Sequence, residues 1–131
     1  VARSWSKRVY PIEVGSSLSL AGTAVGRALL MSCRQSEREA LINQLQVKAP
    51  DEWSQHGVQL MENVQQFWRH GSCVALGEIF ADVQAVAVPL GPINRGELAA
   101  LNFSIQGREI DEDWLRSEIV PQLQSIARQL S

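Results

Sequence analysis

The sequence is poor in the side chains that most often hold metals or form disulfide scaffolds. It has two cysteines, Cys33 and Cys73, and two histidines, His56 and His70, in 131 residues. No CxxC pair and no histidine at ligand spacing is present, so we expect no metal and no cofactor. The sequence alone is compatible with one disulfide between the two cysteines. Two reduced, partly buried thiols fit better, because the chain is not a disulfide-dense scaffold.

The sequence also lacks an excess of basic charge, a long apolar run and a signal peptide. The net charge is −2 and the pI is about 5.7, whereas nucleic-acid-binding domains usually carry a basic face. We therefore expect no direct contact with DNA. No apolar run approaches the ~20 residues of a membrane span, and no leader pattern opens the chain. The chain starts at Val1, within what reads as a strand, which indicates a fragment of a longer cytoplasmic protein.

What the sequence does contain is the average composition of one globular domain, 45% hydrophobic and 20% charged. Alternation and turn residues predict strands, and apolar spacing of three or four predicts helices. Strands are expected within 8–14 and at 72–76, 83–90 and 97–105, with turns at 15–17 and 91–96. Helices are expected at 23–33 with Thr23 as cap, and from Ser36 with Glu39 completing a capping box, until residues 50–53 interrupt that helix. A third helix is marked by Leu60, Val64, Phe67 and Trp68 and ends near Gly71, and a last one follows Asp111 with an irregularity at Pro121.

This order of elements predicts an α+β fold, with an antiparallel sheet and helices packed on one face as its simplest arrangement. One strand carries information about function. Asn102 and Ser104 share a face of the strand 97–105, because side chains alternate along a strand. That face could simply meet water. If it lies beside Ala85 and Ala87 of a strand that is apolar on both faces, small side chains and two polar groups line a small-molecule pocket instead.

The helix that begins near Thr23 offers a complementary feature. Its first backbone N–H groups, those of Ala24, Val25 and Gly26, are expected to be unpaired and to suit a carboxylate or phosphate. The simpler interpretation is that Gly22 and Gly26 allow close helix packing. The spacing matches neither a dinucleotide fingerprint nor a P-loop.

Three segments resemble motifs of the effector-binding domain of IclR-type bacterial regulators. These segments are VGSSLSLAGTAVGRALL at 14–30, HGSCVALGE at 70–78, and DVQAVAVPL at 82–90 continued by AALNFS at 99–104. The resemblance covers nearly the whole chain, which would then be a single domain, 1–131. It implies a GAF/PAS-like fold with a curved antiparallel sheet, and an organic-acid effector held against that sheet. It also implies DNA binding through a separate N-terminal winged helix-turn-helix, and assembly into dimers or tetramers. The early strand and helix of the domain are expected to be missing here.

Positions carried over from the family pattern, together with Gly26 from the helix-start argument, give the candidate ligand-binding residues. These are Leu18, Ala24, Val25, Gly26, Ala75, Val83, Ala85, Asn102 and Ser104, with Cys73 and Glu78 as secondary structural or gating residues. The sequence departs from the pattern at Ala75, where some members have Asp, at Asn102, which replaces a small hydroxyl residue, and at Ser19, which replaces Pro. The pocket is then more apolar than in relatives that bind very small acids, and we expect a larger effector such as an aromatic acid.

Catalysis is not expected. The two histidines are predicted to lie at helix ends on the surface, and Cys73 is predicted to act as a small hydrophobe because no base is identifiable near it. The four tryptophans at 5, 53, 68 and 114 are expected in core or subunit contacts. Two rival interpretations remain: a thiol-dependent enzyme on a GAF-type scaffold, and an oligomerisation module that binds no ligand.

Overall fold

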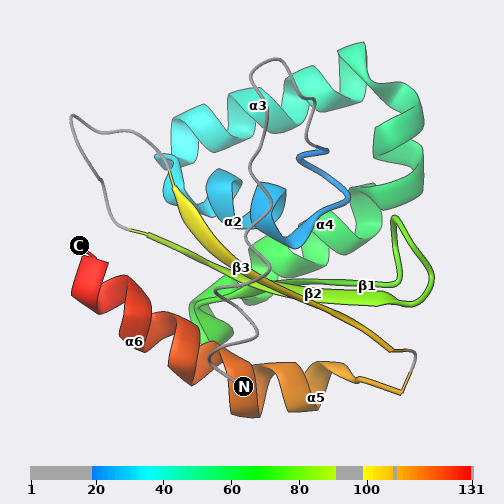
Figure 1. Cartoon of the computed structure of the whole chain (residues 1–131). Coiled ribbons are helices and arrows are strands. Elements are labelled where there is room, and N and C mark those ends of the chain that lie inside the picture. The colour runs from blue at the N-terminus through cyan, green and yellow to red at the C-terminus, as the bar shows by residue number, and fades with distance from the viewer. Residues whose placement is uncertain (1–18, 91–98, 108, 131) are drawn as a thin grey trace.

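A three-stranded antiparallel sheet separates two layers of helices (Figure 1). The computed structural model describes residues 19–90, 99–107 and 109–130. Helices α2, α3 and α4 lie on one side of the sheet, and α5, η1 and α6 lie on the other. The predicted α+β class is confirmed, whereas the expectation that helices cover a single face is wrong. The final helix has a strongly apolar side, and it covers the second face of the sheet.

The first helical layer follows the local start and stop signals. Helix α2 spans Ala24–Ser32, and the Oγ1 of Thr23 accepts a hydrogen bond from the N–H of Gly26, as a helix cap does. Helix α3 spans Gln35–Lys48 and α4 spans Pro50–His70. Proline is favourable at a first helical position, where its missing N–H costs nothing. Gly71 ends α4 in a left-handed conformation with φ of 65°.

The capping box predicted at Ser36 is wrong. Helix α3 begins one residue earlier, at Gln35, and its cap residue Arg34 makes no side-chain capping bond. The carboxylate of Glu39 instead accepts a hydrogen bond from the side chain of Gln35, at 3.1 Å. The apolar stripe on α3 is confirmed, because Leu41, Ile42 and Leu45 all pack against a core cluster that includes Leu60 of α4.

Strands β1 (Cys73–Leu76), β2 (Val83–Pro89) and β3 (Ala100–Gln106) form the sheet in the order β1-β2-β3. The three strands lie close to the predicted ranges. On one face of the sheet, the side chains of Val74, Val86, Val88 and Phe103 enter the main core. The predicted opening strand, the turn at 15–17 and the turn at 91–96 lie outside the described residues.

The second helical layer completes this core. Helix α5 (Glu112–Trp114) begins at Asp111, whose carboxylate accepts a bond from the N–H of Trp114, as predicted. It continues into the π-helical turn η1 (Leu115–Ile119) and then into α6 (Val120–Leu130). The widened turn lies directly before Pro121, where the missing N–H interrupts regular helix bonding. The irregularity expected at this proline is therefore confirmed.

Candidate functional site

The sheet face toward α2 carries small and polar side chains in two rows. Cα pairing aligns Cys73 with Ala87 and Asn102 in one row, and Ala75 with Ala85 and Ser104 in the next. Directly paired residues point to the same face of a sheet. The neighbourhood predicted from alternation, with Ala85 and Ala87 beside Asn102 and Ser104, is therefore the one that the structure contains. We call this surface the alanine face.

Helix α2 lies directly on part of the alanine face. Ala24 and Ala28 of the helix are buried against Ala75 and Ala87 of the sheet, and Val25, Ala85 and Ala100 pack around them. Small residues on both sides let the helix approach the sheet closely, so much of the volume expected from small side chains is filled by α2. Ala85 and Ser104 are half-buried, and Asn102 is exposed. The accessible part of the alanine face is thus its β3 side.

The first turn of α2 differs from the expectation at one residue. The N–H of Gly26 is bonded to Oγ1 of Thr23 at 3.0 Å, so the prediction that this N–H is unpaired is wrong. Ala24 and Val25 precede it in the same turn, which contains no acidic residue. A Cβ added to Gly26 would lie 2.5 Å from the carbonyl oxygen of Ser19. The close packing suggested by the simpler interpretation is therefore the observed role of this glycine.

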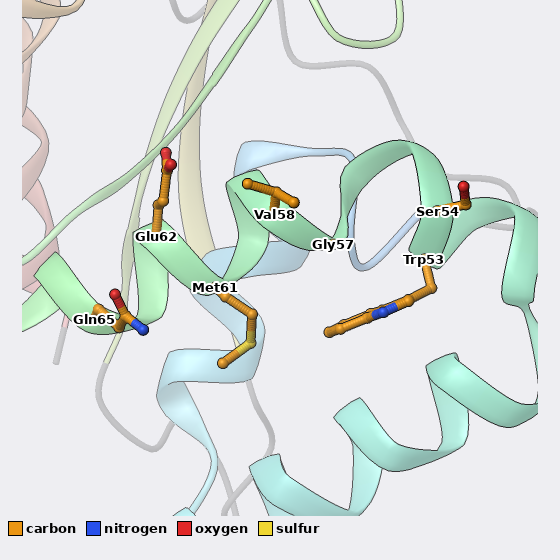
Figure 2. A pocket seen from close by; sticks show the side chains of 7 residues that line it. All are labelled: Trp53, Ser54, Gly57, Val58, Met61, Glu62 and Gln65. Atoms are coloured by element: carbon orange, nitrogen blue, oxygen red, sulfur yellow. The ribbon is translucent and has the colours of Figure 1, made fainter.

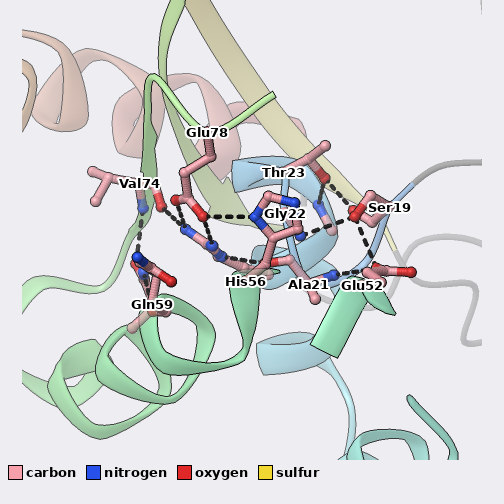
Figure 3. A network of polar contacts seen from close by, with 12 residues as sticks. Ser19, Ala21, Gly22, Thr23, Glu52, His56, Gln59, Val74 and Glu78 are labelled. Atoms are coloured by element: carbon pink, nitrogen blue, oxygen red, sulfur yellow. Dashed lines mark hydrogen bonds and ion pairs between the residues drawn. The ribbon is translucent and has the colours of Figure 1, made fainter. Parts of the chain in front are cut away.

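The turn that leads into α2 is held by a carboxylate from α4 (Figure 3). Oε2 of Glu52 accepts hydrogen bonds from Oγ of Ser19 at 2.8 Å and from the N–H of Ala21 at 3.0 Å. Oγ of Ser19 in turn accepts a bond from the N–H of Gly22 at 2.9 Å. These contacts fix the backbone immediately before the helix, and Ser19 makes them at the position where the family pattern has proline.

Arg27 lies behind this turn, fully buried at 1% exposure. Its guanidinium meets the Glu78 carboxylate in a two-pronged ion pair, with both N–O distances at 2.6 Å. It also donates to the carbonyl oxygens of Ala21 at 2.8 Å and Val74 at 2.6 Å. A buried cation is tolerated only when it is paired and hydrogen-bonded in this way. Glu78 is thus the carboxylate partner of the buried Arg27.

His56 does not lie on the surface, and that prediction is wrong. Its ring is buried, and its Nδ1 is 3.1 Å from Oε1 of Glu78. A Cβ added to Gly22 would lie 2.8 Å from the ring, so the imidazole packs tightly on the turn before α2. The sequence around His56 does not indicate its partner, because Glu78 lies 22 positions further along the chain. His70 does lie in the last turn of α4, as expected.

The two cysteines are free thiols, in agreement with the expectation. Cys73 is completely buried, and burial raises the pKa of its thiol to about 12. Burial also raises the pKa of Cys33. A thiol with such a raised pKa is almost entirely protonated at neutral pH and is a poor nucleophile.

A groove of about 450 Å³ lies away from the alanine face, on α4. It is lined by Trp53, Ser54, Gly57, Val58, Met61, Glu62 and Gln65. Figure 2 shows Trp53 and Met61 projecting from the same side of the helix. Trp53 packs against the core cluster of α3 and α4, while Trp68 is 79% exposed and so is not a core residue. No pattern in the sequence predicts this groove.

Two further properties concern the described residues only. Within 19–90, 99–107 and 109–130, no group of three or more His, Cys, Asp or Glu side chains is arranged to hold a metal ion. No helix in the same ranges is long and apolar enough to cross a membrane.

The structure thus brings together most of the predicted site. Ala24, Val25, Ala75 and Ala85 share one cluster, Asn102 and Ser104 lie beside it on β3, and Cys73 is buried in the same sheet rows. Val83 begins β2 at the far end of that face, opposite Gln106. Leu18 lies outside the described residues. Sequence reasoning missed Arg27 and Glu52, although Arg27 stands within an otherwise small and apolar helix, which is a signal for a buried, paired charge.

An α+β fold with helices on both faces of an antiparallel sheet is compatible with many functions, and comparison with known proteins identifies the family. Residues 4–131 match the family described as "Bacterial transcriptional regulator IclR C-terminal", and the chain belongs to that family. A curated relative, the HTH-type transcriptional regulator TsaQ1/TsaQ2 of Comamonas testosteroni, is 23% identical over 127 residues. That alignment covers 97% of this chain and 46% of the relative.

Solved structures agree with this assignment. An IclR family transcriptional regulator from Brucella abortus is similar with a TM-score of 0.80 and 26% identity, over 95% of this chain and 47% of that one. The PobR inducer binding domain from Acinetobacter, a double mutant in complex with 3-hydroxybenzoic acid, has the same fold, with a TM-score of 0.60 and 22% identity, over 94% and 72%. This chain therefore spans about half the length of the TsaQ1/TsaQ2 and Brucella regulators.

Proposed function

We propose that this chain is the non-catalytic, effector-sensing domain of a transcription regulator and that it binds a small organic acid, such as an aromatic carboxylic acid. The observation that carries the proposal is the position of α2, whose first turn lies on the alanine face beside Asn102 and Ser104. A helix N-terminus carries partial positive charge that favours a carboxylate. The first turn of α2 contains no acidic side chain that would oppose it.

In this proposal the acid lies at the β3 side of the alanine face. Its carboxylate meets the N–H groups of Ala24 and Val25, and its apolar body lies over Ala85 and Val83. Asn102 and Ser104 supply hydrogen bonds that fix its orientation. Ala75 lines the floor of this site. The PobR domain, described with a bound hydroxybenzoic acid, supports an aromatic acid as a ligand class that this fold can hold.

We further propose that the sensing domain acts in a dimer or tetramer and reaches DNA only through a separate N-terminal domain. Regulators such as TsaQ1/TsaQ2 are about twice as long as this chain and are of the helix-turn-helix type. An acid that prefers one assembly geometry would shift the population toward it, in proportion to its difference in affinity for the two states.

The test is thermal melting of the domain against acetate, pyruvate, benzoate and 3-hydroxybenzoate, with benzamide as a neutral control of the same shape as benzoate. A ligand that binds only the folded form at a hundred times its dissociation constant adds about 2.7 kcal/mol of stability. We expect a shift of several degrees with the aromatic acids and none with benzamide. Shifts with two- and three-carbon acids alone would refute the preference for an aromatic acid. A flat panel would favour the ligand-free oligomerisation module.

A further inference from the structure

Ala21 is held from both sides by charged side chains, one from the distant helix α4 and one from α2, which directly follows it. Its N–H donates to Oε2 of Glu52 on α4, at 3.0 Å. Its carbonyl oxygen accepts from Nε of Arg27 on α2, at 2.8 Å. The residue is itself fully buried. The peptide groups on either side of Ala21 are therefore a fixed point of the turn, three residues before the first helical N–H groups.

The guanidinium of Arg27, which holds this point, is itself fixed by Glu78. The guanidinium is a rigid fork, and a carboxylate that accepts from both Nη atoms fixes its plane. The two bonds to Glu78 are 2.6 Å each, and Nη1 also donates to the carbonyl of Val74 on β1. The Nε donor, in the same plane, is then aimed at the carbonyl oxygen of Ala21. The sheet and the turn after β1 thus determine where the start of α2 lies.

Glu78 acts on the same turn through a second route. Its Oε1 is 3.1 Å from Nδ1 of His56, a residue of α4 that is 7% exposed. The opposite edge of that imidazole packs against Gly22, where an added Cβ would lie 2.9 Å from Nε2. One carboxylate therefore orients two of the groups that contact the turn before α2, the guanidinium at Ala21 and the imidazole at Gly22, while Glu52 contacts the same turn independently (Figure 3).

We propose that Glu78 is a positioning residue for effector binding: it acts through Arg27 and His56 to hold the Ala21–Gly22 turn, and so places the N–H groups of Ala24 and Val25 for the effector's carboxylate. The proposal rests on the function proposed above. Glu78 touches no effector itself, so it contributes to affinity only through this preorganisation.

The experiment compares the variant Glu78→Gln with a control variant, Glu112→Gln. Glu112 also pairs with an arginine, Arg116, at 2.7 Å, but on the other side of the sheet. The first readout needs no ligand: amide hydrogen exchange, resolved by residue. We expect Glu78→Gln to raise exchange at Gly22 and at residues 24–26 at least tenfold more than at Val86 and Phe103 in the sheet. Glu112→Gln should leave this ratio within twofold of the wild-type value.

The second readout is the affinity for 3-hydroxybenzoate, measured by calorimetry at a temperature where near-ultraviolet circular dichroism shows each variant fully folded. We expect at least a tenfold loss for Glu78→Gln and less than a twofold change for Glu112→Gln. A rise in exchange that is equal at the turn and in the sheet would mean that Glu78 only stabilises the fold, and would overturn the proposal. Unchanged affinity would overturn it as well.

Removing one partner of a buried ion pair can unfold a domain, so a second variant keeps the test decisive. The double substitution Arg27→Met with Glu78→Leu replaces the buried pair by apolar side chains of similar size, which proteins often tolerate. We expect it to fold while exchange at the turn stays high and binding stays weak. Wild-type affinity in the double variant would overturn the proposal. If the wild-type domain binds no acid, the proposed function fails, and the exchange pattern still decides whether Glu78 positions the start of α2.

Discussion

The side-chain amide of Asn102 donates a hydrogen bond to the hydroxyl of Ser104, with 2.9 Å between Nδ2 and Oγ. The two residues are neighbours on the same face of β3, at the accessible side of the alanine face. Because Ser104 accepts in this contact, its own hydroxyl hydrogen can be donated to a ligand. The contact also restricts the rotamers of both side chains, which lowers the entropy lost when a ligand binds.

Replacing either residue should weaken binding without unfolding the domain. Ser104→Ala removes a hydroxyl group. Asn102→Leu replaces the side-chain amide by an apolar group of similar volume. A hydrogen bond contributes about 0.5–1.5 kcal/mol, which corresponds to a loss in affinity of about two- to tenfold. Since Asn102 is exposed and Ser104 half-buried, we expect melting temperatures without ligand to stay within a few degrees. Calorimetric titration with 3-hydroxybenzoate measures the first effect.

Gln106→Ala is the matched control for these substitutions. Gln106 lies on the same face two residues beyond Ser104, and its exposed side chain bonds to the carboxylate of Asp82 at 2.7 Å. It should leave the affinity within twofold. An equal loss in all three variants would place the ligand elsewhere or show a general effect of altering β3.

Gly26→Ala should destabilise the domain by about 1–3 kcal/mol, as overpacking does. The new Cβ would lie 2.5 Å from the carbonyl oxygen of Ser19 and 2.7 Å from Cα of Leu20. Both are backbone atoms of a turn that Glu52 and Arg27 hold in place, so neither can rotate away. Chemical denaturation of the wild type and the variant measures the difference.

The comparison for this variant is Gly57→Ala, in the middle of α4. There the nearest atoms belong to the ring of Trp53, at 2.9 Å, and a side chain beside an open groove can shift. Alanine also gains about 0.5–1 kcal/mol over glycine inside a helix. We expect Gly57→Ala to stay within about 1 kcal/mol of the wild type. A larger cost at Gly57 than at Gly26 would contradict this account of the two sites.

Local chemistry explains which elements could be predicted. The cap at Thr23, the Gly71 stop and the Asp111 cap each depend on residues within one helical turn. The three strands follow from alternation for the same reason. The segment 50–53, predicted to interrupt the helices, instead forms the first turn of α4. Ser36 shows the limit of the method: serine is a common cap, but here the helix starts one residue earlier, at a position without a typical capping side chain.

The charged cluster behind α2 could not be predicted because its partners are far apart in sequence. Arg27 and Glu78 are separated by 51 positions, and His56 reaches Glu78 from a third element. Periodicity describes one element at a time and does not show which charged groups meet. For the same reason the second helical layer could not be predicted. Apolar spacing in the final helix indicates a buried side, but it does not show which face of the sheet that side covers.

That second layer has a direct test in stability. Leu115, the first residue of η1, is fully buried in the main core against the sheet. Leu130, in the last turn of α6, is 55% exposed. Leu115→Ala should cost about 2–5 kcal/mol through lost burial and the cavity left behind. Leu130→Ala should change stability by less than about 0.5 kcal/mol. Equal losses of unfolding free energy for the two variants in urea denaturation would contradict the placement of η1 against the sheet.

The pH dependence of stability tests whether the Cys73 thiol is buried and protonated. Burial raises the pKa of Cys73 to about 12, compared with an ordinary value of 9.0, so almost no thiolate forms at pH 7 in the folded protein. The folded state holds this proton more tightly than the unfolded state. Its contribution to stability is therefore complete below about pH 9 and is lost as the pH rises toward 12. We expect Cys73→Ala to reduce the fall in stability between pH 9 and pH 11.

Thiol-labelling rates separate the two cysteines. Cys33 is only half-buried, and although its pKa is also raised, it should react with a disulfide reagent far faster than Cys73 in the native domain. Cys33→Ser should abolish the fast phase, and Cys73 should react only at the rate of unfolding, with both thiols reacting together in denaturant. Rapid native labelling of Cys73 at neutral pH would instead require an open, activated thiol beside the alanine face, and would favour the thiol-dependent enzyme over the sensor.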